Sequence, residues 1–129
     1  MWLIAAAFVF FLGAIVLMRP VRRYEVAGES MLPSYAPGDR LIAESVSYRL
    51  REPRVGEVVI VSQPGSNGRS DLKRIVAAPG EPVQVLGEDR HLTDDEWFVV
   101  GDNLGRSTDS RTLGPVRRRD ILARVWIQY

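Results

Sequence analysis

The chain of 129 residues contains no cysteine, one histidine, His91, and one lysine, Lys73, beside 16 arginines. Without cysteine there is no thiol nucleophile, no disulfide framework and no cysteine-rich zinc or iron–sulfur site. A single histidine excludes a histidine cluster around a metal, and a Ser-His-Asp triad would have to use His91. The nucleophiles that remain are serine and threonine, and their most plausible base is a lysine amine withdrawn from water.

The arginine bias explains why lysine is rare, but it does not explain why Lys73 is retained. Arginine cannot lose its proton in a protein, whereas burial can drive a lysine ammonium toward the neutral amine. Lowering the ordinary lysine pKa by two units requires about 2.7 kcal/mol of preferential destabilisation of the charged form. Lys73 lies in LKRIVAA (72–78), where strand alternation puts it on one face with Ile75 and Ala77. The strand alone favours the simpler interpretation, an edge-strand lysine that opposes aggregation.

The N-terminal segment is apolar and has no acidic residue. Residues 2–18 are uncharged, and as a helix they would be about 26 Å long, at the short end for a membrane span. The run is closed by a proline and three arginines, Arg19, Pro20, Arg22 and Arg23. No small-residue cleavage site follows a shorter apolar core, so residues 1–23 are predicted to be a retained membrane anchor. A buried core helix and a cleaved leader are the alternatives.

The charge distribution separates this anchor from a second domain, residues 24–129. Residues 1–23 carry a net charge of +3, and residues 24–129 carry 14 basic and 16 acidic side chains, a net charge of −2. An acidic domain argues against nucleic acid as a partner. The arginines follow the apolar run, so the positive-inside rule by itself would put the second domain in the cytoplasm.

Residues 24–129 show no sustained helical period. Short apolar runs instead recur behind Pro-Gly and Gly-acid turns, which predicts a mainly β fold, a small antiparallel barrel or coiled sheet. The cluster at 62–71 is expected to form a hairpin tip, and 117–122 one helical turn. Trp97, Phe98 and Trp126 are expected in the core. The expected strands are 40–46, 58–62, 72–78, 82–86, 96–102 and 121–129.

Two further segments supply polar chemistry. Ser30 lies in VAGESMLPSYAPGDRLI (26–42), where Pro33 interrupts any regular strand, and a serine at such a bend presents its hydroxyl and nearby N–H groups to a substrate. The glycine-rich segment 99–116 gathers hydroxyls, carboxylates and Arg111, which suits a hydrogen-bonded loop that orients another group. Each signal is weak by itself, because surface loops often use these residues.

Taken together, the three segments resemble the type I signal peptidases, a family of membrane-anchored Ser/Lys endopeptidases. The resemblance rests on S-M-L-P-x-x-x-P-G-D, K-R-I-V-x-x-P-G-E and G-D-N-x-x-x-S-x-D-S-R-x-x-G-P-V, found here in that order behind an apolar segment. It covers nearly the whole chain. It implies a β-rich domain on the extracytoplasmic side of a membrane, preprotein substrates with small residues at positions −1 and −3, and no cofactor or metal.

The resemblance also implies roles for particular residues. Ser30 matches the nucleophile, its backbone N–H an oxyanion donor, and Lys73 the general base, which reverses the edge-strand interpretation. Ser107 matches a serine that hydrogen-bonds the lysine amine, and Met31 a residue near the pockets for small substrate side chains. Supporting positions match Asp109, Arg111, Arg74, Asp102 and Asn103.

Several positions depart from the family pattern. Position 28 is glycine, where some members carry a serine that helps to hold the oxyanion. Asp71 stands two residues before Lys73, where a carboxylate would stabilise the ammonium, so Asp71 is expected to face solvent or to lie beyond the strand. The segment 74–100 is short, as in mitochondrial inner-membrane proteases and the peptidases that mature nickel superoxide dismutase.

Three functions therefore remain open: a signal peptidase of broad specificity, a maturation peptidase for one substrate such as nickel superoxide dismutase, and a non-enzymatic membrane-anchored adaptor. Intact Ser30, Lys73 and Ser107 argue against the adaptor. His91 and the acidic run 94–96 are interpreted as solvated surface rather than a metal site, because no motif spacing supports one.

Overall fold

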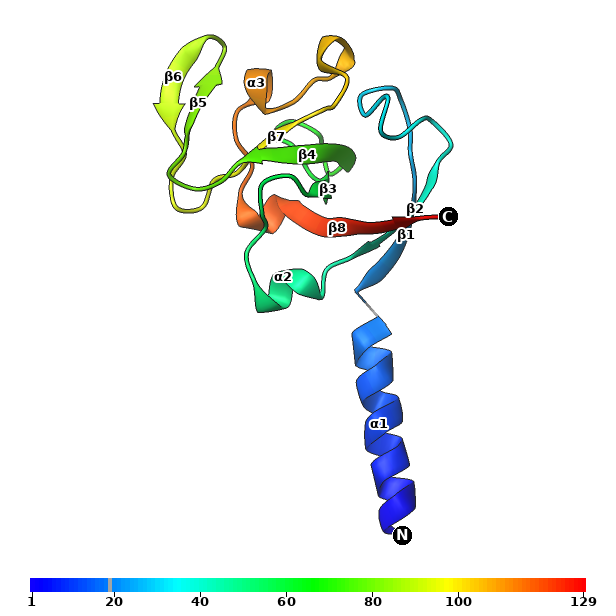
Figure 1. The fold of residues 1–129 in the computed structure, drawn as a ribbon. Helices are drawn as coiled ribbons and strands as arrows, with labels where there is room; N and C mark the ends of the chain where they lie inside the picture. The colour runs from blue at the N-terminus through cyan, green and yellow to red at the C-terminus, as the bar shows by residue number, and fades with distance from the viewer. Residues whose placement is uncertain (19) are drawn as a thin grey trace.

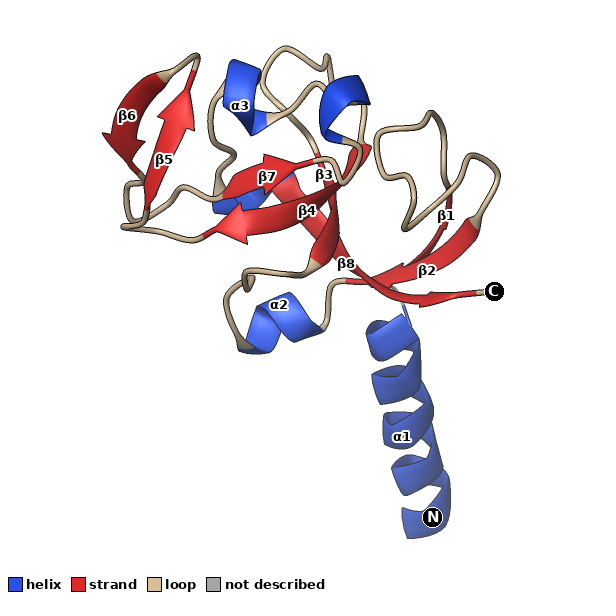
Figure 2. Cartoon of the chain, turned by 45° about the horizontal axis from the view of Figure 1, so that its top comes forward, coloured by secondary structure: helices blue, strands red, loops and turns tan. Residues whose placement is uncertain are grey.

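The computed structural model describes residues 1–18 and 20–129, and the side chains of all of these except 15–18. Helix α1 (Trp2–Met18) extends away from a domain built mainly of antiparallel strands (Figures 1 and 2). Within the described residues, no helix has both the length and the apolar character needed to cross a membrane.

Six strands form one antiparallel sheet in the order β1-β2-β8-β3-β4-β7. As described, this sheet has β1 and β7 at its ends and is not a closed barrel, so the expected mainly β antiparallel fold is confirmed but a barrel is not observed. The strands are β1 (Val21–Glu25), β2 (Arg40–Glu44), β3 (Val58–Val61), β4 (Asp71–Ala77), β7 (Phe98–Val100) and β8 (Ile121–Gln128).

The remaining elements are short. A separate hairpin pairs β5 (Pro82–Val85) with β6 (Glu88–His91), and it stands apart from the six-stranded sheet in Figure 1. Helices α2 (Ser47–Leu50) and α3 (Ser110–Leu113) are single turns, as are the 3₁₀ segments Leu104–Arg106 and Arg118–Asp120. The predicted strands and the helical turn within 117–122 are confirmed, and the 62–71 cluster does connect the paired strands β3 and β4.

The core lies on both faces of the central strands because successive side chains point to opposite faces. In β4, Leu72 packs in one apolar cluster with Met31 and Leu41, whereas Ile75 packs in another with Val59. A third cluster lies under the β5–β6 hairpin. Strand β4 is therefore packed on both faces, so the backbone that carries Lys73 is held in place.

Two expectations need correction. Trp126 is 59% exposed on β8 and not in the core, although Trp97 and Phe98 are buried as expected. The last three residues of strand β8 are exposed, so at this point the strand extends beyond the buried part of the sheet. Strand β1 begins at Val21, within the segment interpreted as the basic flank of an anchor.

Candidate active site

The side chains of Ser30 and Lys73 meet although 43 positions separate them in the chain. The Lys73 Nζ donates a hydrogen bond of 3.0 Å to the Ser30 Oγ. Strand β4 presents the lysine, and the turn that follows β1 presents the serine. This distance lies within the reach required for proton transfer between a nucleophile and its base.

Burial favours the neutral form of the Lys73 amine. The residue is 4% exposed, and loss of hydration lowers its pKa. The Asp71 and Asp109 carboxylates oppose this by raising the pKa, and the Arg111 guanidinium lowers it again. The net direction is downward, as a lysine base requires.

Hydrogen bonds from Asn103 hold the backbone around Ser30. The Asn103 N–H donates to the Ser30 carbonyl oxygen at 2.8 Å, and its Nδ2 donates to the Glu29 carbonyl oxygen at 3.0 Å. Within the described chain no group accepts the Ser30 N–H, so this donor is available to a ligand.

The residue before Asn103 ties the same turn to β4. Asp102 accepts two hydrogen bonds of 2.9 Å from Arg74 Nε and Nη2, and one of 2.6 Å from the Ser34 hydroxyl. The Arg74 side chain lowers the pKa of Asp102, and the Ser34 hydrogen bond lowers it further. Asp102 therefore links the strand that carries Lys73, through Arg74, to the turn that carries Ser30, through Ser34.

A second ion pair organises the loop behind Lys73. Asp109 is 1% exposed and accepts bidentate hydrogen bonds of 2.9 and 3.0 Å from Arg111. It also accepts from the Ser107 hydroxyl at 2.6 Å and from the Gly101 N–H at 3.0 Å. Burial alone would raise the pKa of Asp109, but these hydrogen bonds lower it. The carboxylate stays charged and satisfied.

Gly101 permits the close approach of these parts. A Cβ built at this position would overlap the Ser107 hydroxyl and would lie 2.6 Å from the Ser30 carbonyl oxygen. Sequence analysis missed this residue. The signal that could have found it is its position at the start of the G-D-N motif, between two segments that carry functional side chains.

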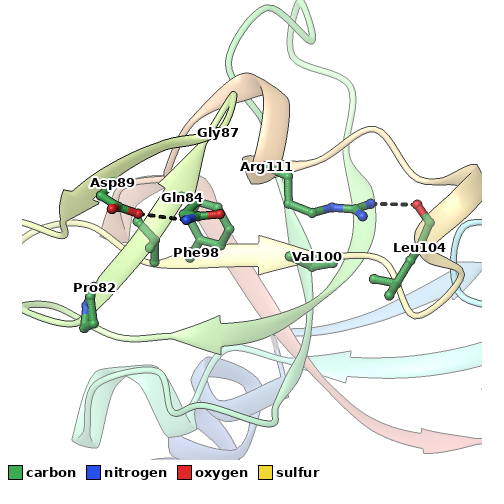
Figure 3. Close-up of a pocket in the computed structure, with 9 residues that line it drawn as sticks. Pro82, Gln84, Gly87, Asp89, Phe98, Val100, Leu104 and Arg111 are labelled. Carbon is green, nitrogen blue, oxygen red and sulfur yellow. Dashed lines mark hydrogen bonds between the residues drawn. The ribbon is translucent and has the colours of Figure 1, made fainter.

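Ser30 and Lys73 open onto a cleft of about 470 Å³. Polar side chains line most of it, and its walls come from the serine turn, the β3–β4 connection and the loop before α3. A larger hollow of about 660 Å³ lies between the β5–β6 hairpin, β7 and Arg111, and neither Ser30 nor Lys73 lines it (Figure 3). Within the described residues, no group of three or more histidine, aspartate and glutamate side chains is placed to hold a metal ion.

The chain also matches known proteins. Residues 1–93 and 86–129 match the family described as signal peptidase, peptidase S26. The chain belongs to this family. This confirms the resemblance drawn from the three sequence motifs.

Relatives of the chain carry related names. Signal peptidase I of Leptolyngbya laminosa is 30% identical over 81% of the chain and 66% of its own length. The mitochondrial ATP-independent inner membrane protease subunit 1a of Arabidopsis thaliana is 36% identical over 78% of the chain and 68% of its own length. A probable thylakoidal processing peptidase 2 of the same plant is 32% identical over 81% of the chain and 36% of its own length. The chain thus spans just under two thirds of the Leptolyngbya peptidase.

The expected positions for this family fall together with three exceptions. The Ser107 hydroxyl donates its hydrogen bond to Asp109, and within the described chain it makes no hydrogen bond to Lys73. Met31 is 1% exposed and packs in the core beneath the serine turn, so its side chain is not on the surface of the cleft. Asp71 is not beyond the strand, because it is the first residue of β4, and it is half-buried and lines the cleft.

Proposed function

We propose that the chain is a serine endopeptidase that removes signal peptides from preproteins after small residues, with Ser30 as the nucleophile and Lys73 as the general base. The observation that carries this proposal is the 3.0 Å hydrogen bond between the two side chains, made by a lysine whose pKa is lowered by burial. Membership of the signal peptidase family supplies the substrate class.

The proposed reaction has two halves. The Ser30 oxygen attacks the scissile carbonyl carbon while the neutral Lys73 amine takes the hydroxyl proton. The tetrahedral intermediate collapses, the leaving amine takes that proton from Lys73, and an ester remains on Ser30. Lys73 then removes a proton from the attacking water. As the second tetrahedral intermediate collapses, the bond between the acyl carbon and the Ser30 oxygen breaks, Lys73 returns the proton to that oxygen, and the new carboxyl end leaves.

The proposed oxyanion donor is the backbone N–H of Ser30, which no described group accepts. Gly28 has a backbone φ of +76°, a conformation that residues other than glycine rarely adopt. A serine at position 28 would be strained in this backbone, so a hydroxyl donor from that position is not part of the proposal.

Ser107, Asp109 and Arg111 are proposed to act as support for Lys73. The Ser107 oxygen has its proton committed to Asp109, so only a lone pair remains for the amine. Ser107→Ala is therefore expected to lower turnover without abolishing it. Met31 is proposed to act from below, by fixing the turn through core packing.

The experiment is cleavage of a preprotein with alanine at −1 and −3 by the purified full chain. Ser30→Ala and Lys73→Ala are each expected to reduce cleavage to background while the β-domain stays folded. Ser45→Ala is the matched control, because the Ser45 hydroxyl bonds the Pro20 carbonyl oxygen away from the cleft. Turnover retained by Ser30→Ala would rule out this nucleophile, and a wild-type chain that cleaves no preprotein would favour the adaptor. A peptidase dedicated to one substrate would cleave only one member of a panel of preproteins that share the same −1 and −3 residues.

We also propose that helix α1, at the start of the predicted anchor segment 1–23, holds the chain in a lipid bilayer, with residues 24–129 on the extracytoplasmic side. The exposed apolar side chains of α1 support this, and so do the exposed aromatic rings of Trp126 and Tyr129 on or beside β8. The arginines after the helix favour the opposite side.

A sidedness assay separates the two topologies. The chain has no cysteine, so Asp94→Cys places a single thiol at an exposed turn of the β-domain. Labelling of intact cells by a membrane-impermeant maleimide is expected. Labelling only after permeabilisation would put the domain in the cytoplasm.

A further inference from the structure

Asp71 presents a difficulty for the proposed base. It lies two positions before Lys73 on β4, and residues so spaced point to the same face about 6.6 Å apart. Both line the same cleft. A carboxylate that paired with the Lys73 ammonium would hold its proton and remove the base. Yet none of the ion pairs of the described chain joins these two residues.

A glutamine from the β3–β4 connection forms a hydrogen bond with the Asp71 carboxylate instead. The Gln63 Nε2 donates a hydrogen bond of 3.0 Å to the Asp71 Oδ2, and another of 3.1 Å to the Thr108 carbonyl oxygen. Thr108 lies between Ser107 and Asp109 in the loop that backs the site. Gln63 thus links the Asp71 carboxylate to the backbone of the loop that carries Ser107 and Asp109.

The orientation of this amide is fixed by its neighbours. Two acceptors surround the Nε2, so the opposite orientation would put the Gln63 carbonyl oxygen against two other oxygens. In the orientation observed, the Gln63 Oε1 is buried and has no hydrogen-bond partner within the described chain. The side chain is 5% exposed and keeps its two donated hydrogen bonds at the cost of one unsatisfied acceptor.

We propose that Gln63 is a positioning residue for the reaction: it holds the Asp71 carboxylate and thereby prevents this group from pairing with the Lys73 amine. The proposal rests on the proposed role of Lys73 as the base. Without the glutamine donor, the carboxylate would be free to turn toward the Lys73 ammonium, which lines the same cleft.

Other charges face Lys73 and do not replace this restraint. Asp109 is saturated by Arg111, Ser107 and the Gly101 N–H. Further out, Arg69, Arg106 and Glu29 line the cleft, and the last two form an ion pair of 3.3 Å. On the far side, Tyr24 faces Asp71, and this carboxylate adds to the effect of burial in raising the tyrosine pKa. These groups stay constant in the variants below.

Direct titration of the single lysine tests the proposal. In full-length protein labelled with ¹³C-lysine, only Lys73 gives a lysine side-chain signal, so its pKa can be followed by NMR without an activity assay. Gln63→Met is expected to raise the Lys73 pKa by about one unit, because it releases Asp71. Asp71→Asn is expected to lower it by a similar amount. The double variant Gln63→Met/Asp71→Asn should titrate like Asp71→Asn alone.

Kinetics provide the second measurement. The acidic limb of the pH profile of kcat/KM should follow the Lys73 pKa. At pH values below this pKa, Gln63→Met should therefore lower kcat/KM about tenfold, and the double variant should recover it. Asp94→Asn is the control for net charge, since Asp94 is exposed and outside the cleft.

The outcomes separate the two proposals. A Lys73 pKa that Gln63→Met leaves unchanged, or a loss of rate that Asp71→Asn does not recover, would overturn the role of Gln63. The expected NMR shifts in a protein that cleaves no preprotein would support the restraint on Lys73 and reject the peptidase proposal instead.

Discussion

Two carboxylates organise two parts of this domain, and they are bonded in nearly the same way. Glu57 accepts bidentate hydrogen bonds of 3.0 and 2.6 Å from Arg51, one of 3.2 Å from the Tyr48 hydroxyl and one of 2.7 Å from the Arg54 N–H. Asp109 has the same kind of set: a bidentate arginine, a hydroxyl and backbone N–H groups. In each case burial would raise the carboxyl pKa, and hydrogen bonds lower it.

The difference lies in the cations around them. The cations near Glu57 are arginines, Arg51 and Arg124, which keep their protons under all ordinary conditions. Near Asp109 lies Lys73, an amine that can lose its proton and that forms no ion pair within the described part of the chain. Two similar polar networks thus lie beside different cations. Only the network around Asp109 lies beside an amine that could serve the proton transfer proposed above.

The largest effect is expected when Lys73 is replaced by arginine, because both carboxylates then have only arginines as neighbouring cations. Lys73→Arg keeps the positive charge but removes the capacity to act as a neutral base, so cleavage should fall by about 10²- to 10⁴-fold. The measurement is kcat/KM at several pH values up to 10. An active Lys73→Arg enzyme would show that the amine is not the base.

Removal of one carboxylate charge at a time is expected to have the next largest effect. Asp109→Asn and Glu57→Gln should each destabilise the fold, because each replaces the charged acceptor of a bidentate arginine by a neutral amide. Each lowered carboxyl pKa means that the stabilisation is complete above the ordinary pKa of about 4 and is lost as pH falls through the folded value.

In chemical denaturation between pH 3 and 7, the free energy of unfolding should therefore depend less on pH in both variants than in the wild type. Only Asp109→Asn should also change the pH profile of cleavage. An equal change in Glu57→Gln would show that the two networks are not functionally distinct.

A smaller effect is expected from filling the space beside Asp109. Gly101→Ala should cost about 1–3 kcal/mol, because its methyl group would overlap the Ser107 hydroxyl and approach the Ser30 carbonyl oxygen. Gly105→Ala is the matched control, since a Cβ there meets nothing within 4 Å. Thermal unfolding and cleavage rates of both variants provide the test, and an unimpaired Gly101→Ala would contradict the close packing.

The smallest expected effect is a gain in stability. Lys73→Met keeps the length of the side chain and removes the buried charge, so it should stabilise the inactive protein by about 1 kcal/mol at pH 7. The Lys73 pKa is lowered on folding, so wild-type stability rises as pH increases toward the ordinary lysine pKa. The advantage of methionine should shrink over that range, and a constant difference in denaturation experiments would argue against a strained ammonium.

The sequence predicted the elements that its apolar runs mark. Strand β6 was not expected, because its four residues are all exposed and none is apolar. Strand β1 was not expected either, because its two arginines, Arg22 and Arg23, had been interpreted as the end of an anchor. Both strands are specified by their pairing partners rather than by their own composition.

The candidate site was predicted as a set of residues but not as a set of contacts. The motifs named Ser30 and Lys73, yet nothing in them indicates that Ser107 donates to Asp109 or that Gln63 holds Asp71. Those hydrogen bonds depend on how three loops meet in space. A glutamine in a turn-rich segment carries no local signal of such a role.

The position of β8 in the sheet has a consequence for biosynthesis. The serine turn belongs to the β1–β2 side of the sheet and Lys73 to the β3–β4–β7 side, and β8 pairs with both β2 and β3. Residues 121–128 follow all the other strands in order of translation. A nascent chain therefore carries its nucleophile and its amine on two halves that lack their shared strand, and the sheet that joins these halves cannot form until the ribosome has made that segment.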